Sequence, residues 1–576
     1  DDTPVFKIEG GVSLPLTETV SARIAVKTHQ RDDWIDNEIK NGRGPQTEEG
    51  LDGVNEFAGR TTLVWTPSER FDAVFRATIG RRDGDHVPLH FEALDNPASF
   101  VRHGGFNEDP AIDVVSQDRP SPEKVEYENV SLHLNWDLDW GSITSISGFI
   151  HALYNQDADV DGTPRDGLFG PFEADSDQFS QEFRVAVEAT DTVDLIFGAY
   201  FFTEDMNGFN WFLTGADLGP NAQFAGCCEN SGFGNIEQRE RNSYAAFASI
   251  DYQISDTLNL AAGVRYTNDE EDWAFQQLFW VFEGSRFNDG VPDSNSAVEL
   301  FDSGTLSESW DEITGDISLT YSLSDDINLY GKFARGYLSG NHVLPFTGTF
   351  FSVVEPEQID SFELGAKGTY LDGRLQINAA IFDYDYENVQ VQRGTTEPTQ
   401  GGFISVRENA AAATVRGVEF DLTFLPSENW LLRAGGGYTN AEFDEFLSQL
   451  PGGGFEDFAG FEFPNVPEIT GYVDVRYNVP LANGASLELA TDWNYADDYF
   501  VDLNYIADNI GESRTIGNAY LRYHSPDEDW TLSLFARNVA DKEYVVNRRD
   551  FANALEGNLV IYGTPRVLGL SLGMNF

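Results

Sequence analysis

The final residues of the chain, 568–576, alternate strictly between two kinds of side chain. One face carries Leu568, Leu570, Leu572, Met574 and Phe576, and the other carries Gly569, Ser571, Gly573 and Asn575. A period of two is typical of a β-strand with different surroundings on its two faces. A chain that ends this way, on an aromatic residue, is typical of a closed outer-membrane β-barrel, in which the last strand pairs with the first. We therefore interpret Phe576 as a barrel-assembly signal.

The length and composition agree with one large antiparallel up-and-down barrel. The 576 residues exceed the roughly 100–200 residues of an ordinary domain, whereas a barrel wall grows by adding hairpins. No apolar run reaches about 18 residues, so membrane-spanning helices are excluded. Strands remain compatible with a membrane, because only every second residue faces lipid. We expect residues 1–576 to form a single barrel domain.

Short polar turns divide the chain at regular intervals. They lie at residues 15–18, 67–70, 139–141, 190–192, 255–257, 324–326, 371–373, 426–429, 481–484 and 526–529. Turns of this chemistry close tight hairpins, and each pair of neighbouring turns encloses two strands and one long loop. The pattern predicts short periplasmic turns, long extracellular loops and 21 strands in this sequence. Because single-chain bacterial barrels use even numbers, we expect one more strand upstream of Asp1, which gives 22.

The net charge of −60 excludes nucleic acid as a partner, since phosphate repels such a surface. One interpretation is a solvated acidic exterior. The other is that loop carboxylates hold divalent cations such as Ca²⁺, or that cations bridge them to lipopolysaccharide. Asp157, Asp159 and Asp161 match the opening of a calcium loop, although Leu168 stands where that motif has Glu. A weaker candidate is the run Asp269, Glu270 and Glu271. No covalent cofactor is expected.

Two further sets of loop residues are candidates for special roles. The only cysteines, Cys227 and Cys228, are adjacent, and in an oxidising compartment they are candidates for a disulfide. Aromatic clusters in long loops can bind a planar or sugar-like ligand, although such residues also serve as girdle or packing residues. The candidate ligand contacts are Phe209, Trp211, Phe212, Trp273, Trp280 and Phe282.

Several segments resemble landmarks of the TonB-dependent outer-membrane receptors. The strongest is 356–367, Pro-Glu-Gln-Ile-Asp-Ser-Phe-Glu-Leu-Gly-Ala-Lys, which continues through 371–378 and 382–386. Others are 178–184, 333–340, 416–419, 465–468 and 538–544. Each segment is weak alone, but together they follow the family order and end at the terminal aromatic residue. The resemblance covers essentially the whole chain.

The resemblance implies a 22-stranded barrel in the outer membrane of a Gram-negative bacterium, which imports a scarce nutrient. The ligands of the family are siderophores, cobalamin, haem and carbohydrates, and the TonB complex supplies energy through a plug domain. Nothing in this sequence resembles that plug, and 1–16 resembles the second barrel strand, so we expect the plug and first strand upstream or on another chain. A nucleophile–base arrangement with catalytic spacing is not found, and no enzyme activity is expected. The alternatives are a passive channel and an anchor for a surface assembly, including an accessory lipoprotein.

Overall fold

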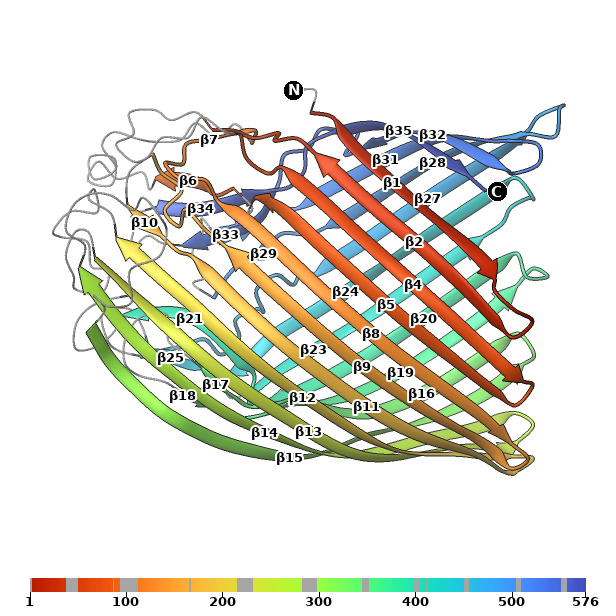
Figure 1. Ribbon diagram of the computed structural model, residues 1–576. Helices are drawn as coiled ribbons and strands as arrows, with labels where there is room; N and C mark the ends of the chain where they lie inside the picture. The colour runs from red at the N-terminus through yellow and green to blue at the C-terminus, as the bar shows by residue number, and fades with distance from the viewer. Residues whose placement is uncertain are drawn as a thin grey trace.

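The computed structural model describes residues 3–37, 50–85, 88–93, 112–164, 167–214, 231–281, 298–343, 352–396, 403–410, 412–449, 455–503, 509–550 and 557–575. Within these ranges, no helix has the length and apolar character needed to cross a membrane. Strands dominate instead, and they curve into one large sheet (Figure 1).

The large sheet contains 22 strands. One of them, the two-residue β10 (Leu168–Phe169), only pairs with the end of β12, beyond the part of β12 that pairs with β11. The other 21 strands follow one another antiparallel around the wall, as the sequence predicts. They are β1 (Val5–Pro15), β2 (Val20–Arg31), β4 (Val54–Ser68), β5 (Phe71–Asp85), β8 (Pro122–Leu138), β9 (Gly141–Gln156), β11 (Phe172–Thr190), β12 (Val193–Thr214), β13 (Ser231–Ser255), β14 (Leu258–Val281), β15 (Val298–Ser324), β16 (Ile327–Leu338), β19 (Glu357–Tyr370), β20 (Leu375–Glu387), β23 (Ala412–Phe424), β24 (Trp430–Glu445), β27 (Ile469–Pro480), β28 (Ser486–Ala496), β31 (Arg514–His524), β32 (Trp530–Arg537) and β35 (Val567–Met574).

All ten predicted short turns connect neighbouring wall strands, and they lie together at one end of the barrel (Figure 1). The turn between β19 and β20 shows why its residues suit it. Leu371, Asp372 and Gly373 have φ angles of 57°, 56° and 84°, a left-handed conformation that glycine adopts without strain and that tight hairpins need. The long loops lie at the opposite end, which we call the loop end.

Alternation along the strands separates an outer from an inner face. Large apolar side chains are exposed at many alternate positions, because none of the described residues packs over the outside of the wall there. Examples are Phe197, Tyr244, Val264, Ile317, Phe362, Leu364, Val418 and Phe420. The intervening positions face the lumen and carry mostly small or polar residues. This is the pattern of a barrel surrounded by lipid.

The wall has two edges. Among the described residues, β1 pairs only with β2, and β35 pairs only with β32. Pro15 ends β1 beside the first short turn, and Met574 ends β35 opposite Trp530, which follows the last short turn. Both edge strands therefore run toward the short-turn end, as the odd strand number requires. The additional strand that we expect upstream of Asp1 stays a prediction.

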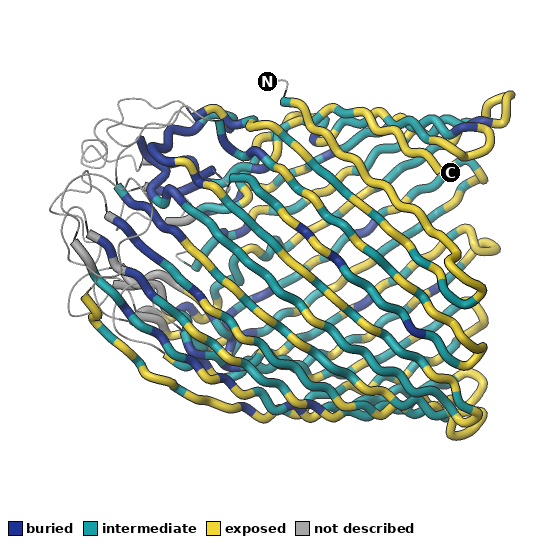
Figure 2. The backbone as a smooth tube through the Cα atoms, in the orientation of Figure 1, coloured by how far each residue is buried: buried dark blue, intermediate teal, exposed yellow. Residues whose placement is uncertain are grey.

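Small sheets cap the loop end. They pair β3 (Asp36–Asn37) with β7 (Val114–Val115), β17 (Asn341–Val343) with β18 (Ser352–Val354), β21 (Gln390–Thr396) with β22 (Phe403–Asn409), β25 (Leu447–Gln449) with β26 (Phe455–Asp457), β29 (Tyr499–Phe500) with β30 (Ile510–Gly511), and β34 (Gly557–Tyr562) with both β33 (Val545–Asp550) and β6 (His90–Ala93). Figure 2 shows that buried residues gather at this end.

The loop end has apolar cores of its own. One cluster joins segments from three loops or strand ends and consists of Val389, Val391, Ala410, Ala413, Phe443, Phe446 and Phe458. Burial of this kind holds loops in place, so the described loop segments form a packed cap.

Candidate functional site

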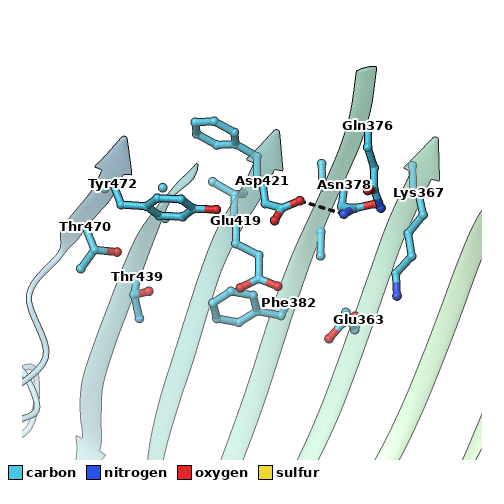
Figure 3. A pocket seen from close by; sticks show the side chains of 18 of the residues that line it. Glu363, Lys367, Gln376, Asn378, Phe382, Glu419, Asp421, Thr439, Thr470 and Tyr472 are labelled. Atoms are coloured by element: carbon cyan, nitrogen blue, oxygen red, sulfur yellow. Dashed lines mark hydrogen bonds between the residues drawn. The ribbon is translucent and has the colours of Figure 1, made fainter. Parts of the chain in front are cut away.

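The lumen wall is hollowed in the region from β16 to β28, with a cavity of about 840 Å³ (Figure 3). Its charged and polar lining side chains include Glu363, Asn378, Glu419 and Tyr472, which alternate along their strands with exposed outer residues such as Val418. A glycine makes room for one lining ring: a Cβ on Gly435 would lie 2.4 Å from a ring carbon of Tyr472. The position of the Tyr472 ring therefore depends on a residue without a side chain.

Carboxylates dominate this hollow, which we call the acidic hollow. Glu363, Glu419 and Asp421 line it together with one cation, Lys367. The Tyr330 hydroxyl donates to Glu363, and Asn378 Nδ2 donates to Asp421 Oδ1 at 2.8 Å. Lys367 Nζ lies 5.3 Å from the centre of the Tyr330 ring. The excess of negative charge suits contact with a positively charged group.

A second cavity, of about 490 Å³, lies nearer the loop end and has more basic side chains in its lining. Its charged lining residues are Arg239, Arg241, Arg407 and Glu237, and His342 also lines it. The β13 residues among them are odd-numbered and face the lumen, because the even-numbered Tyr244 is exposed on the outer surface. We call this cavity the arginine pocket.

Glu271 of β14 organises one side of the arginine pocket. Its side chain is 2% exposed and receives Arg241 Nε at 2.7 Å and Arg239 Nη1 at 3.2 Å. The backbone N–H of His342 donates to Glu271 Oε1 at 2.8 Å, and His342 Nδ1 lies 2.9 Å from the same oxygen.

The predicted ligand aromatics divide between opposite faces of the wall. Trp273 faces inward, is fully buried, and stacks on His342 with ring centres 5.3 Å apart. Trp211 packs on the other face of β13 with Phe169 and Leu213. Both tryptophans are therefore packing residues here, and Phe212 is likewise buried.

Phe209 is the candidate aromatic that lines the arginine pocket, beside its contact with Trp211. The side chain of Trp280, and all of Phe282, lie outside the described residues, as do Cys227, Cys228 and Phe576. Their proposed roles stay predictions.

The candidate calcium loop folds as a compact turn at the loop end. Asp159 Oδ1 accepts the Gly162 N–H at 2.9 Å, and Asp161 Oδ1 accepts the Thr163 N–H at 2.9 Å. Burial, then Asp161 and Asp118, raise the pKa of Asp159 well above its ordinary value, while burial and Glu173 raise that of Asp157. In the described part of the chain, no group of three or more metal-ligating side chains has metal-site geometry. Calcium binding here stays a prediction.

The second acidic run is split by strand alternation. Glu271 is held inside by the arginines, and Asp269 Oδ2 accepts the Tyr337 hydroxyl at 2.6 Å. Glu270 is exposed and lines a shallow outer cleft with Asp272 and Glu308. These carboxylates therefore do not meet at one point.

The arginines are functional candidates that our sequence analysis missed. Arg239 and Arg241 are separated by one residue, which in a strand places both on one face. Both are odd-numbered, whereas the exposed, outward-facing Tyr244 is even-numbered. Strand alternation would therefore have placed both arginines in the lumen. The convergence of Arg407 and His342, from two other loops, has no local sequence signal.

Comparison with known proteins decides the family. The family described as "TonB dependent receptor-like, beta-barrel" matches residues 80–539. The chain belongs to the TonB-dependent receptors. Members of this family are outer-membrane receptors and transporters of Gram-negative bacteria rather than enzymes, and the barrel described above agrees with that localisation.

Curated relatives of this receptor are named as receptors for ferric pyoverdines and for pesticin. It is 22% identical over 353 residues to a ferric-pyoverdine 358 receptor of Pseudomonas putida, a match that covers 59% of this chain and 36% of that receptor. It is 24% identical over 305 residues to a pesticin receptor of Yersinia pestis, covering 52% and 38% of the two chains. The matched part thus spans less than half the length of these relatives.

Solved structures of TonB-dependent receptors share the fold. The ferric yersiniabactin uptake receptor FyuA of Yersinia pestis superposes with a TM-score of 0.76 at 16% identity, covering 99% of this chain and 78% of that chain. The siderophore receptor PiuA of Acinetobacter baumannii gives 0.71 at 16% identity, with 98% and 79% covered. At such identities the likeness establishes the fold alone.

Proposed function

We propose that this receptor imports a metal chelate of the siderophore type across the outer membrane, with energy supplied through TonB. Its family membership supports a nutrient receptor, and the observation that carries the finer proposal is the nature of its relatives. One sequence relative is named as a ferric-pyoverdine receptor. Two structural neighbours are named as a ferric yersiniabactin uptake receptor and a siderophore receptor. The arginine pocket, close to the loop end of the lumen, supplies a surface where a chelate entering from outside can bind.

Uptake of radioactive iron by the native bacterium tests the proposal. Iron-starved cells would be given iron complexed with the chelators of their own culture medium, with and without deletion of the receptor gene. We expect deletion to lower uptake, and expect an uncoupler of the proton-motive force to abolish the receptor-dependent part. Receptor-dependent uptake that persists with the uncoupler would instead establish a passive channel.

A matched control separates loss of transport from loss of the protein. Cells that carry the receptor but lack TonB should bind the chelate at their surface without accumulating iron. Equal accumulation with and without the receptor would overturn the proposal that iron chelates are its cargo.

A further inference from the structure

Several strand pairs of the wall share one contact, in which an aromatic ring lies against a glycine directly opposite it. At each of these glycines, an added Cβ would fall between 2.1 and 2.5 Å from a ring atom, closer than real Cβ atoms approach. Glycine therefore makes room for the ring, and the ring covers backbone that glycine leaves bare. These glycine–aromatic pairs are Gly80–Tyr127, Gly198–Phe247, Gly365–Tyr330, Gly417–Phe382, Gly435–Tyr472, Gly517–Trp493 and Gly569–Phe535.

All of these pairs lie between two strands that a long loop joins. Between strands that a short turn joins, the nearest approach of a ring to an opposite glycine in the described part of the wall is that of Phe420 to Gly436, at 3.4 Å, an ordinary contact. The pairs therefore follow the kind of connection between the strands. The strand pairs that have them are β5 and β8, β12 and β13, β16 and β19, β20 and β23, β24 and β27, β28 and β31, and β32 and β35.

A short turn and a long loop differ in what they fix. A tight turn sets which residues of its two strands lie opposite each other. A long loop does not, because adding two residues to it changes the free energy of loop closure only slightly. The alternation of faces excludes a slip of one residue, which would turn every side chain to the wrong face, but a slip of two residues keeps every face. Strands joined by a long loop therefore need a further register signal.

A glycine–aromatic pair is such a signal, because a slip of two residues destroys it. After such a slip, Phe535 would lie opposite Val567 or Ser571 in place of Gly569. Both of those residues have a Cβ where the ring needs space. The other pairs behave in the same way, except that Gly435 has a second glycine, Gly437, two residues away on one side.

Basic side chains restrict three of the rings further. A cation within about 6 Å of a ring centre is attracted to the face of that ring. A ring that contacts both a glycine and a cation has less freedom to turn away from the wall than a ring that contacts the glycine alone. The three contacts are Arg265 with Phe247 at 5.8 Å, Lys367 with Tyr330 at 5.3 Å, and Arg537 with Phe535 at 5.3 Å.

We propose that the glycine–aromatic pairs fix the register of the strands that long loops join, as the short turns do for the other strand pairs. This role belongs to the assembly of the wall and does not depend on the transported ligand. Its consequence is that the long loops can differ in length and sequence without shifting the strands that carry them.

Cysteine cross-linking measures the register of β32 and β35 directly. Ser533 lies opposite Ser571, whereas Thr531 lies opposite Gly573. The combination of Ser533→Cys with Ser571→Cys should therefore form a disulfide in the observed register. The combination of Thr531→Cys with Ser571→Cys should form one only after a slip of two residues, because diagonal neighbours are too far apart. Both combinations are made in the full receptor with Cys227→Ser and Cys228→Ser, and are oxidised after refolding from urea into detergent micelles.

Phe535→Ala removes the ring without adding a clash. We expect it to raise the ratio of slipped to observed cross-link by about threefold, the usual effect of a cross-strand aromatic contact. Leu534→Ala, on the outer face of the same strand, is the control and should leave the ratio unaltered. A ratio that Phe535→Ala does not change, or that Leu534→Ala raises equally, would overturn the proposal.

Gly569→Ala tests the same pair from the other strand. It should lower the yield of refolded, heat-modifiable protein by about tenfold, because the added methyl group meets the ring. Gly573→Ala lies on the same strand, its Cβ would meet nothing within 4 Å, and its yield should stay unaltered. Adding Phe535→Ala to Gly569→Ala should recover most of the yield, since the two residues act as a pair. Absence of this recovery would also contradict the proposal.

Discussion

Glu271 and His342 are 71 residues apart in sequence, and one carboxylate oxygen of Glu271 receives both the backbone N–H and the ring Nδ1 of His342. This contact joins the wall strand β14 to β17, a short strand in the loop between β16 and β19. Trp273 covers His342 from one side by stacking. The position of one loop hairpin is therefore set by a single buried side chain of the wall.

Glu271→Gln is expected to release this hairpin. Hydrogen bonds to a buried charged group contribute about 1.5–3 kcal/mol each, and the variant removes the charge that His342 and both arginines share. Hydrogen exchange followed by mass spectrometry should show faster exchange in 341–343. Glu270→Gln changes the neighbouring, exposed residue and should leave this exchange unaltered. Unaltered exchange in both variants would show that Trp273 alone suffices.

The turn around Asp159 is expected to become more stable as the pH falls from neutral. Its pKa in the folded chain lies well above the ordinary value, because burial, Asp161 and Asp118 disfavour its charge. The stability that Asp159 contributes to the folded turn is therefore fully present below the ordinary pKa of an aspartate. It is lost as the pH rises through the raised pKa of Asp159 in the folded chain. Hydrogen exchange of residues 157–164, corrected for intrinsic rates, measures this.

Asp159→Asn should flatten that pH dependence, because the variant does not titrate. Asp139→Asn, in an exposed short turn, serves as the control and should leave the slope in place. A slope that is the same in all three proteins would show that Asp159 is not its source.

Glu92→Ala is expected to loosen the sheet that joins the two ends of the chain. Glu92 accepts Arg548 Nη2 at 3.0 Å and the Tyr562 hydroxyl at 3.1 Å, across more than 450 residues of sequence. Loss of both contacts should cost about 1–3 kcal/mol. Trypsin should then cleave after Arg548 or Arg549 sooner. The control Glu126→Ala breaks a partly exposed contact on the outer wall and should leave that cleavage rate unchanged.

Gly141→Ala is expected to impair the barrel. Gly141 has a φ of 152°, and a Cβ there would lie 2.0 Å from the carbonyl oxygen of Ala186 on the neighbouring strand. Backbone cannot yield as a flexible side chain can, so a cost of about 1–3 kcal/mol is expected. The temperature at which the detergent-resistant form unfolds on a gel should fall. Gly10→Ala is the control, because its Cβ would meet nothing within 4 Å.

The wall could be predicted from the sequence because its determinants are local. Each short turn contains the residues that favour a tight turn. Each strand shows its outer and inner faces as alternation in its own sequence, as in the terminal strand from Val567 to Met574. The count of 21 wall strands and the common direction of β1 and β35 followed from these turns, and both are confirmed.

The site could not be predicted in the same way. Whether Trp273 faces a ligand or packs on His342 depends on where a different loop folds, and His342 in that loop lies 69 residues later along the chain. Nor does the sequence around Arg407 indicate that it approaches Arg241. Loop residues on a barrel acquire neighbours from many hairpins at once, whereas wall residues have neighbours that the turn register fixes.

The common direction of β1 and β35 restricts what can complete the ring. An antiparallel partner of either edge must run from the short-turn end to the loop end. A single strand with that polarity satisfies the open hydrogen-bonding groups of both edges at once, whereas a hairpin would place one of its two strands parallel to an edge. The gap between β1 and β35 therefore restricts any closing element by its number of strands and its direction, whatever its side chains are.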